Sequence, residues 1–142
     1  MKRLLAVVAL VFFAATYSTA DATMDAAVSG RMHAEMDLSD YIDAGWGWGS
    51  FGLSLLLSPL LGGGGVIIAA SLSGAGDVPI HRLSLAQEEF SDNQTAFYTY
   101  QKEYEKEATK IRRVANLNQA WIGAGVALGI NLVIVIAILV GL

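Results

Sequence analysis

The sequence contains no cysteine, and this absence removes several classes of function. Without a thiol, the chain forms no disulfide, no cysteine-ligated zinc site, no thiol nucleophile and no N-terminal lipoprotein anchor. Charged residues are also scarce, at 15% of the 142 residues, against about 25% in a typical soluble domain. The net charge of −4 lacks the basic excess that nucleic-acid binding normally needs. We expect one modest domain that contacts membrane lipid and no nucleic acid.

The charges that are present leave two long stretches empty. No Asp, Glu, Lys or Arg occurs at residues 45–76 or 114–142. Each stretch exceeds the roughly 20 apolar residues that a helix needs to cross a bilayer. The sequence therefore predicts an all-α membrane protein, a two-span helical hairpin with membrane segments at residues 45–74 and 119–142.

Residues 1–20 have the form of a secretory signal peptide. Lys2 and Arg3 precede a short apolar run, and Ser18 and Ala20 place small side chains where signal peptidase reads them. Cleavage before Asp21 is the prediction, and an uncleaved anchor is the alternative.

An acidic exported segment, residues 21–44, is expected to follow. Apolar residues recur there every four positions, along one side of a short helix: Met24, Val28, Met32 and Met36. With His33 among these methionines, the segment offers soft ligands that suit Cu(I), which is our third and weakest hypothesis of function.

The first membrane segment contains residues that interrupt helices. Pro59 and the four glycines at residues 62–65 lie in its middle, so the helix should kink or loosen there. Trp46, Trp48 and Phe51 resemble an aromatic belt at the bilayer surface. The alternative is a re-entrant hairpin, in which two half-spans enter and leave on the same side.

A connector at residues 75–84 should lead into an amphipathic helical stalk, residues 85–118, with Ser84 as its cap. The stalk is expected to run directly into the C-terminal span, 119–142. Lys110, Arg112 and Arg113 precede that span, and basic residues stay on the cytoplasmic side. The predicted orientation places residues 21–44 outside and the stalk in the cytoplasm of a bacterial cytoplasmic membrane. His33 and His81 would then lie on opposite sides.

Small residues form rows in both predicted spans, and such rows let helices pack closely in lipid. The predicted packing residues are Ser50, Ser54, Ser58, Gly62, Gly125 and Gly129. These rows join either the two spans of one chain or several copies of it. Asn131 should face protein, either bonded to a neighbour such as Ser54 or Ser58 or lining a conduction path.

The stalk carries aromatic and aliphatic residues that favour a weak coiled coil or a partner-binding face. These are Phe90, Phe97, Tyr100, Tyr104 and Ile111. Packing on the connector or on the bilayer surface is the alternative use of this face.

No hydrolase, metalloprotease or phosphate-binding motif occurs in the sequence, so we expect no enzymatic activity, no cofactor and no metal site. The first hypothesis is an accessory or assembly subunit of a membrane complex, acting through helix association with itself or with another membrane protein. The alternative is a homo-oligomeric pore or membrane-permeabilising protein. Partner, copy number, organism and physiological process stay open.

Overall fold

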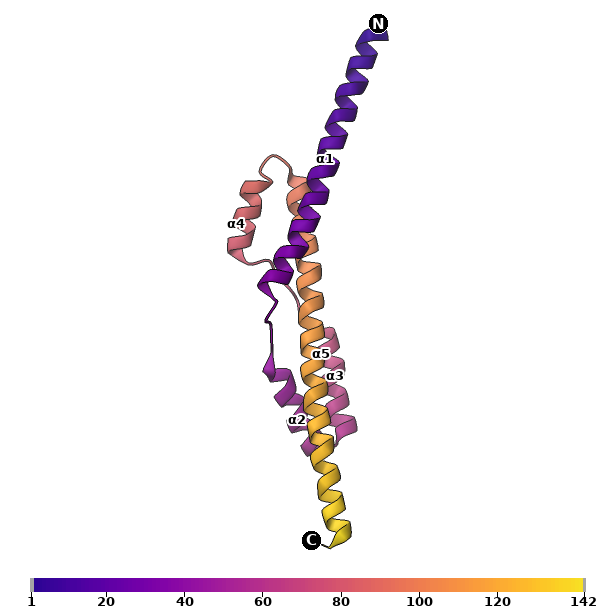
Figure 1. Ribbon diagram of the computed structural model, residues 1–142, viewed down its shortest axis with the longest axis vertical. Coiled ribbons are helices and arrows are strands. Elements are labelled where there is room, and N and C mark those ends of the chain that lie inside the picture. Colours follow the sequence, from indigo (N-terminus) through magenta and orange to yellow (C-terminus); the bar gives the residue numbers. More distant parts are fainter. Residues whose placement is uncertain (1, 142) are drawn as a thin grey trace. The chain divides into compact units, whose positions relative to one another are not determined.

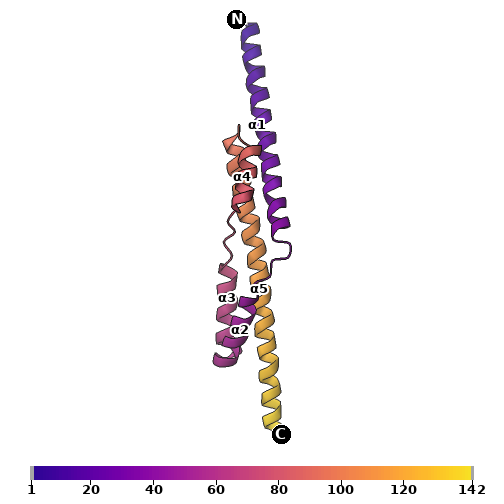
Figure 2. The same cartoon turned by 90° about the vertical axis from the view of Figure 1, so that its left-hand side faces the viewer.

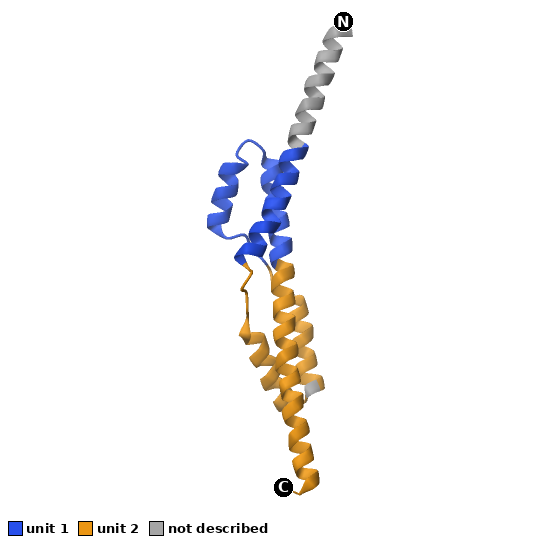
Figure 3. Cartoon of the chain, in the orientation of Figure 1, with its two compact units in different colours: residues 1–37, 76–108 blue, residues 38–75, 109–142 orange. Residues whose placement is uncertain are grey.

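The computed structural model describes the backbone of residues 2–141 and the side chains of residues 20–58 and 60–141. Every regular element in this described part is helical (Figures 1 and 2). The elements are α1 (Lys2–Asp37), α2 (Ala44–Leu57), a short π-helix η1 (Pro59–Gly63), α3 (Gly64–Leu72), α4 (Ile80–Glu89) and α5 (Gln94–Val140). They form two compact units (Figure 3): unit 1, residues 1–37 and 76–108, and unit 2, residues 38–75 and 109–142.

Unit 1 is built from α1, α4 and the first part of α5. Figure 1 shows α4 and α5 as an antiparallel pair, with α1 running beside α5 in the same direction as α5. Alanine and aromatic side chains, together with Val78, fill the space between them: Ala26, Ala34, Ala86, Phe90, Ala96, Tyr100, Tyr104 and Ala108 are also buried. The core is thin, because small residues on α1 bring that helix close to α5.

The stalk helix starts at Gln94, not near residue 85 as expected. A turn closed by the hydrogen bond from the Asn93 amide to the Phe90 carbonyl at 2.9 Å interrupts the helix instead, because short polar residues such as Ser-Asp-Asn at 91–93 favour turns over helix. Asn93 caps α5 by accepting a hydrogen bond from the amide of Ala96 at 3.0 Å. Ser84, the expected cap, lies inside α4, and its hydroxyl donates to the carbonyl of His81 at 2.9 Å.

Gly30 allows the closest approach within unit 1. It is buried in a row with Ala26 and Ala34, each four residues apart on α1. A Cβ placed at Gly30 would lie 2.5 Å from the carbonyl oxygen of Tyr100, so only glycine fits there. The neighbouring row that begins at Met24 is exposed instead.

The predicted signal peptide falls almost wholly on residues 1–19, whose side chains lie outside the described residues. The backbone of α1 continues through the expected cleavage point before Asp21. Cleavage stays a prediction.

Unit 2 contains a helical hairpin in place of the single kinked helix expected at residues 45–74. Helix α2 stops at Ser58, where φ is 134°, and the residue before a proline is disfavoured in helix. The hydroxyl of Ser58 accepts a hydrogen bond from the amide of Leu61 at 3.2 Å. Gly62 then packs against the backbone of Leu53. Helices α2 and α3 therefore lie side by side (Figure 2), as in the re-entrant alternative.

The hairpin packs on the second part of α5 through small residues. Gly123 lies against the backbone of Gly47, and a Cβ at Gly63 would lie 3.0 Å from the Cβ of Ala124. Further along the contact, Ala70, Ala120 and Ala127 are fully buried. Glycine and alanine make this arrangement possible because larger side chains would hold the helices apart.

Among the described residues, α5 is the one helix that is long and apolar enough to cross a membrane. The apolar part of the hairpin at Leu60–Leu72 is too short to do so by itself. The described residues therefore show one candidate span and do not show the two full spans expected from the sequence.

Gly62→Ala is expected to destabilise unit 2, because its Cβ would clash with the Leu53 backbone. Overpacking of this kind costs about 1–3 kcal/mol. Gly65→Ala is the matched control, since nothing lies within 4 Å of a Cβ at Gly65, and the gain in helix propensity should make it neutral or slightly stabilising. Unfolding of the detergent-solubilised chain by SDS, followed by circular dichroism, measures both. Equal effects of the two substitutions would contradict the hairpin.

Candidate functional site

The most connected polar group in unit 1 is the carboxylate of Asp37, at the end of α1. Its Oδ1 accepts from Arg82 Nη2 at 2.6 Å, and its Oδ2 accepts from Arg82 Nε at 3.0 Å. Tyr104 also donates its hydroxyl proton to Oδ2 at 2.9 Å. Because Arg82 belongs to α4 and Tyr104 to α5, one carboxylate connects all three helices of unit 1.

Two further contacts join α1 to α5. His33 Nδ1 lies 3.0 Å from the hydroxyl of Tyr100, and the two rings meet edge to face at 5.8 Å. Arg31 pairs with Glu103 through Nη2 at 2.6 Å. Tyr100 and Tyr104 are almost completely buried, so their hydroxyls depend on these partners for hydrogen bonds.

The cluster shifts the acid–base behaviour of its members. The hydrogen bonds from Arg82 lower the pKa of Asp37, and the hydrogen bond from Arg31 likewise lowers the pKa of Glu103. Burial raises the pKa of Tyr100. Burial, and then the hydrogen bond to Asp37, raise that of Tyr104. At neutral pH the cluster therefore holds ionised carboxylates against neutral tyrosines, which suits a structural clamp.

These contacts contradict the predicted placement of residues 21–44 and the stalk on opposite sides of a membrane. Arg31, His33 and Asp37 come from the first segment, and they bond directly to side chains of α4 and α5. Direct hydrogen bonds cannot extend across about 30 Å of hydrocarbon. Residues 21–37 and 94–108 therefore share one side of any membrane that α5 crosses.

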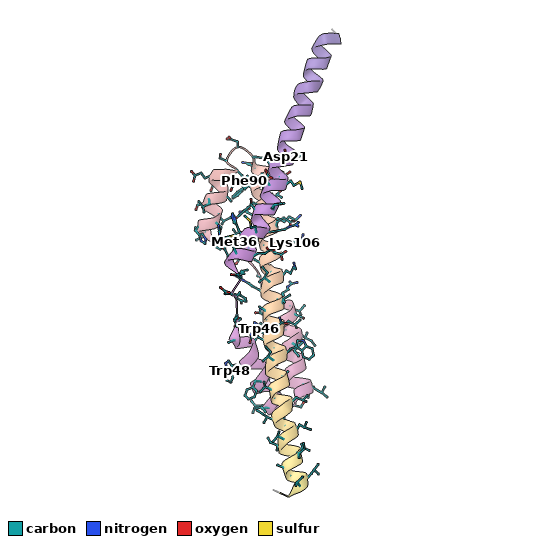
Figure 4. The ribbon with its side chains drawn as sticks, in the orientation of Figure 1. Asp21, Met36, Trp46, Trp48, Phe90 and Lys106 are labelled. Carbon is teal, nitrogen blue, oxygen red and sulfur yellow. The ribbon has the colours of Figure 1, made fainter. Side chains whose placement is uncertain are left out.

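The structure places the predicted stalk face mostly inside unit 1. Phe90 precedes α5 and is buried in the turn after α4 (Figure 4). Tyr100 and Tyr104 are buried in a row with Ala96 and Ala108, each four residues apart. The other two residues of the predicted face, Phe97 and Ile111, stay partly exposed.

The predicted packing residues of unit 2 fall into two groups. Ser50, Ser54 and Gly62 are buried between helices, and Ser58 forms the turn of the hairpin. Gly125 and Gly129 are exposed, and nothing in the described structure lies within 4 Å of a Cβ at either position. They take no part in packing among the described residues.

Asn131 bonds within its own helix, where its Nδ2 donates to the carbonyl of Ala127 at 3.0 Å. This replaces the expected bond to Ser54 or Ser58. The hydroxyls of Ser50 and Ser54 are buried and have no hydrogen-bond partner among the described residues.

A polar group at the end of α3, which sequence reasoning missed, ties the hairpin to α5. Arg112 donates to the carbonyl of Ala75 at 2.6 Å, and Arg113 donates to that of Ser73 at 3.2 Å. The buried amide of Asn116 lies 3.0 Å from Ser73 Oγ. With the amide oriented to satisfy its neighbours, Asn116 Oδ1 also accepts from Trp46 Nε1 at 3.2 Å. The sequence feature that could have revealed this group is Asn116, an asparagine just before the apolar run of α5.

No group of three or more His, Asp or Glu side chains among the described residues is placed to hold a metal ion. The copper hypothesis rested on other ligands, namely His33 and the row of methionines on α1. The methionines are exposed, whereas the His33 ring is directed to Tyr100.

No family model, curated protein or solved structure matches the chain.

Asp37→Asn should destabilise unit 1 by about 2 kcal/mol at neutral pH, because it weakens hydrogen bonds to a charged group. The folded pKa of Asp37 lies below its unfolded value, so its contribution is present above roughly pH 4 and is lost as pH falls through the folded pKa. The difference between variant and wild type should shrink in acid. Hydrogen exchange of unit 1 amides at several pH values measures it, with Glu88→Gln as the control on an exposed side chain. A cost that does not change with pH would rule out an ionised Asp37 as the clamp.

Proposed function

We propose that this protein is a non-enzymatic integral membrane protein that acts by helix association, as an accessory or assembly subunit of a membrane complex. In this proposal α5 crosses the bilayer once with its apolar part, residues 119–140. The hairpin of α2 and α3 enters the bilayer beside α5 without crossing it, and unit 1 stands in the aqueous phase.

The observation that carries the proposal is the division of the small residues of unit 2. Gly47, Gly62, Gly63 and Gly123 are used in packing within the chain, whereas Gly125 and Gly129 are open. At 100° per residue, these two lie about 140–180° around α5 from Ala120, which faces the hairpin. Apolar surface surrounds them, since Leu128, Leu132 and Ile136 are exposed. In lipid, such a face is suited to close packing with another helix.

The hairpin changes what the two orientation signals imply. For two full spans, a signal peptide and the basic residues near 110–113 agree on one orientation. With a single span, unit 1 and these basic residues share a side, so the signal peptide places unit 1 outside and the basic residues place it inside. We propose that residues 21–37 and 76–108 lie on the same side of the membrane.

Single cysteines test the shared side directly, because the chain has none of its own. Ser29→Cys and Ser91→Cys should react with an impermeant thiol reagent from the same side of sealed vesicles. A cysteine added after Leu142 should react from the other. Labelling of intact cells then shows which side unit 1 occupies. Labelling of Ser29→Cys and Ser91→Cys from opposite sides would refute the single-span topology.

Gly125→Leu combined with Gly129→Leu should remove the association, because two large side chains hold a partner helix away. The measurement is a pull-down of the tagged chain in mild detergent, with the mass of the intact assembly and the identity of co-purifying chains. Stoichiometric partners that are lost in the double variant would support an accessory subunit.

Ile134→Phe combined with Ile138→Phe is the matched control, since these exposed residues add bulk to the same apolar segment at the same four-residue spacing, about 140–180° around α5 from Gly125 and Gly129. It should leave the assembly intact. A homo-oligomer without partners, together with ion leakage from reconstituted vesicles, would favour the pore alternative. A monomer without partners would contradict both.

A further inference from the structure

Unit 2 contains an apolar groove with a volume of about 310 Å³ beside the contact between α2 and α5. Its lining consists of Ala44, Gly47, Trp48, Phe51, Gln119, Ile122, Gly123 and Val126. The close contact of Gly47 with Gly123 brings the two helices together along it. Trp48 is exposed on α2 (Figure 4) and meets Phe51 edge to face at 5.9 Å.

The groove lies where the apolar part of α5 begins. Gln119 and Val126 are seven residues apart and therefore lie on nearly the same face of α5. Arg112 is a further seven residues back on that face, about 10.5 Å from Gln119 along the helix. One face of α5 thus presents, in order, a guanidinium, an amide and an apolar groove.

Arg112 and Arg113, before this end of the groove, form no ion pair with a carboxylate among the described residues. Arg112 and Arg113 donate to the backbone carbonyls of Ala75 and Ser73, and the Arg112 guanidinium lies over the Tyr41 ring at 5.6 Å. None of the ion pairs found among the described residues includes either arginine. These partners are neutral, so Arg112 and Arg113, which lie about two turns before Gln119 on α5, keep their positive charge without a carboxylate partner among the described residues.

We propose that this groove binds one anionic phospholipid, with an acyl chain along Trp48, Ile122 and Val126 and the phosphate near Arg112 and Arg113. The proposal rests on the membrane insertion of α5 in the proposed function, and it deepens that function by assigning a lipid class to a defined place.

Charge favours the lipid over a second copy of the chain. Two copies in one membrane share an orientation, so their Arg112 and Arg113 groups would meet at the same depth and repel. A lipid phosphate at that depth instead complements the arginines, and each basic residue near an anionic headgroup contributes attraction. Gly125 and Gly129 do not line the groove, so a lipid there leaves the glycine face open.

Fluorescence of Trp48 tests the proposal in the full-length chain. Trp46→Phe and Trp121→Phe leave Trp48 as the one tryptophan. The chain, in mild-detergent micelles, is titrated with phosphatidylglycerol or phosphatidylcholine brominated on the acyl chain. Saturable quenching by phosphatidylglycerol at lower concentration than by phosphatidylcholine is the expected result.

Substitutions at two positions test the headgroup contact and the acyl-chain contact separately. Arg112→Gln should weaken phosphatidylglycerol binding about fivefold, whereas Arg112→Lys should keep the preference. Val126→Phe should abolish the saturable phase by filling the groove. Val133→Phe, at the next position of the same row, and Lys102→Gln, in unit 1, are the controls and should bind as the parent does.

Equal quenching by both lipids in every variant would overturn the proposal. Efficient disulfide formation between a chain that carries Ala44→Cys and a second chain that carries Val126→Cys, without lipid quenching, would also overturn the proposal. It would assign the groove to a second copy. Alkaline extraction of membranes tests insertion separately. A chain released by alkali contradicts the proposed function, and a retained chain without lipid preference contradicts only the lipid site.

Discussion

The close approach of helix backbones at a few glycines is the constraint on which the described structure depends. In unit 1, Gly30 lets α1 reach the backbone of α5. In unit 2, Gly62 allows the hairpin to close on Leu53, and Gly123 allows the hairpin to seat on α5. Water drives apolar burial in soluble proteins, but lipid supplies little of that force, so close packing must hold membrane helices together. Small residues provide this close packing in unit 2, which we propose to lie in lipid, whereas in unit 1 they bring α1 close to α5.

Polar side chains then decide which helices meet. The carboxylate of Asp37 reaches α4 through Arg82 and α5 through Tyr104. In unit 2, Arg112, Arg113 and Asn116 bind groups at the end of the hairpin. A helix end leaves carbonyls without partners, and these donors stabilise the chain where α3 stops. Small residues allow the close contacts, whereas the hydrogen bonds select one arrangement among several that such residues would permit.

The proposed function rests on two surfaces that the packing of the described helices leaves open. The glycine face at residues 125 and 129 and the groove beside Trp48 are separate surfaces of the same helix. One is suited to a helix, because it is small and flat, and the other to a lipid, because it is apolar with a cationic end. In the proposed function both surfaces serve recognition, one of a helix and the other of a lipid.

The sequence by itself determined the helical composition, the apolar C-terminal segment and the identity of the small residues, because these follow from local propensity and hydropathy. It also placed Ser50, Ser54 and Gly62 in a row that is buried. Only the tertiary structure decided that α2 and α3 fold back on each other, since Pro59 and its glycines are equally compatible with a kink. The partners of Asp37 were likewise hidden from sequence, because its contacts with Arg82 and Tyr104 extend over 45 and 67 residues. Pairings at such separations depend on how the helices pack, and no local pattern in a single sequence records them.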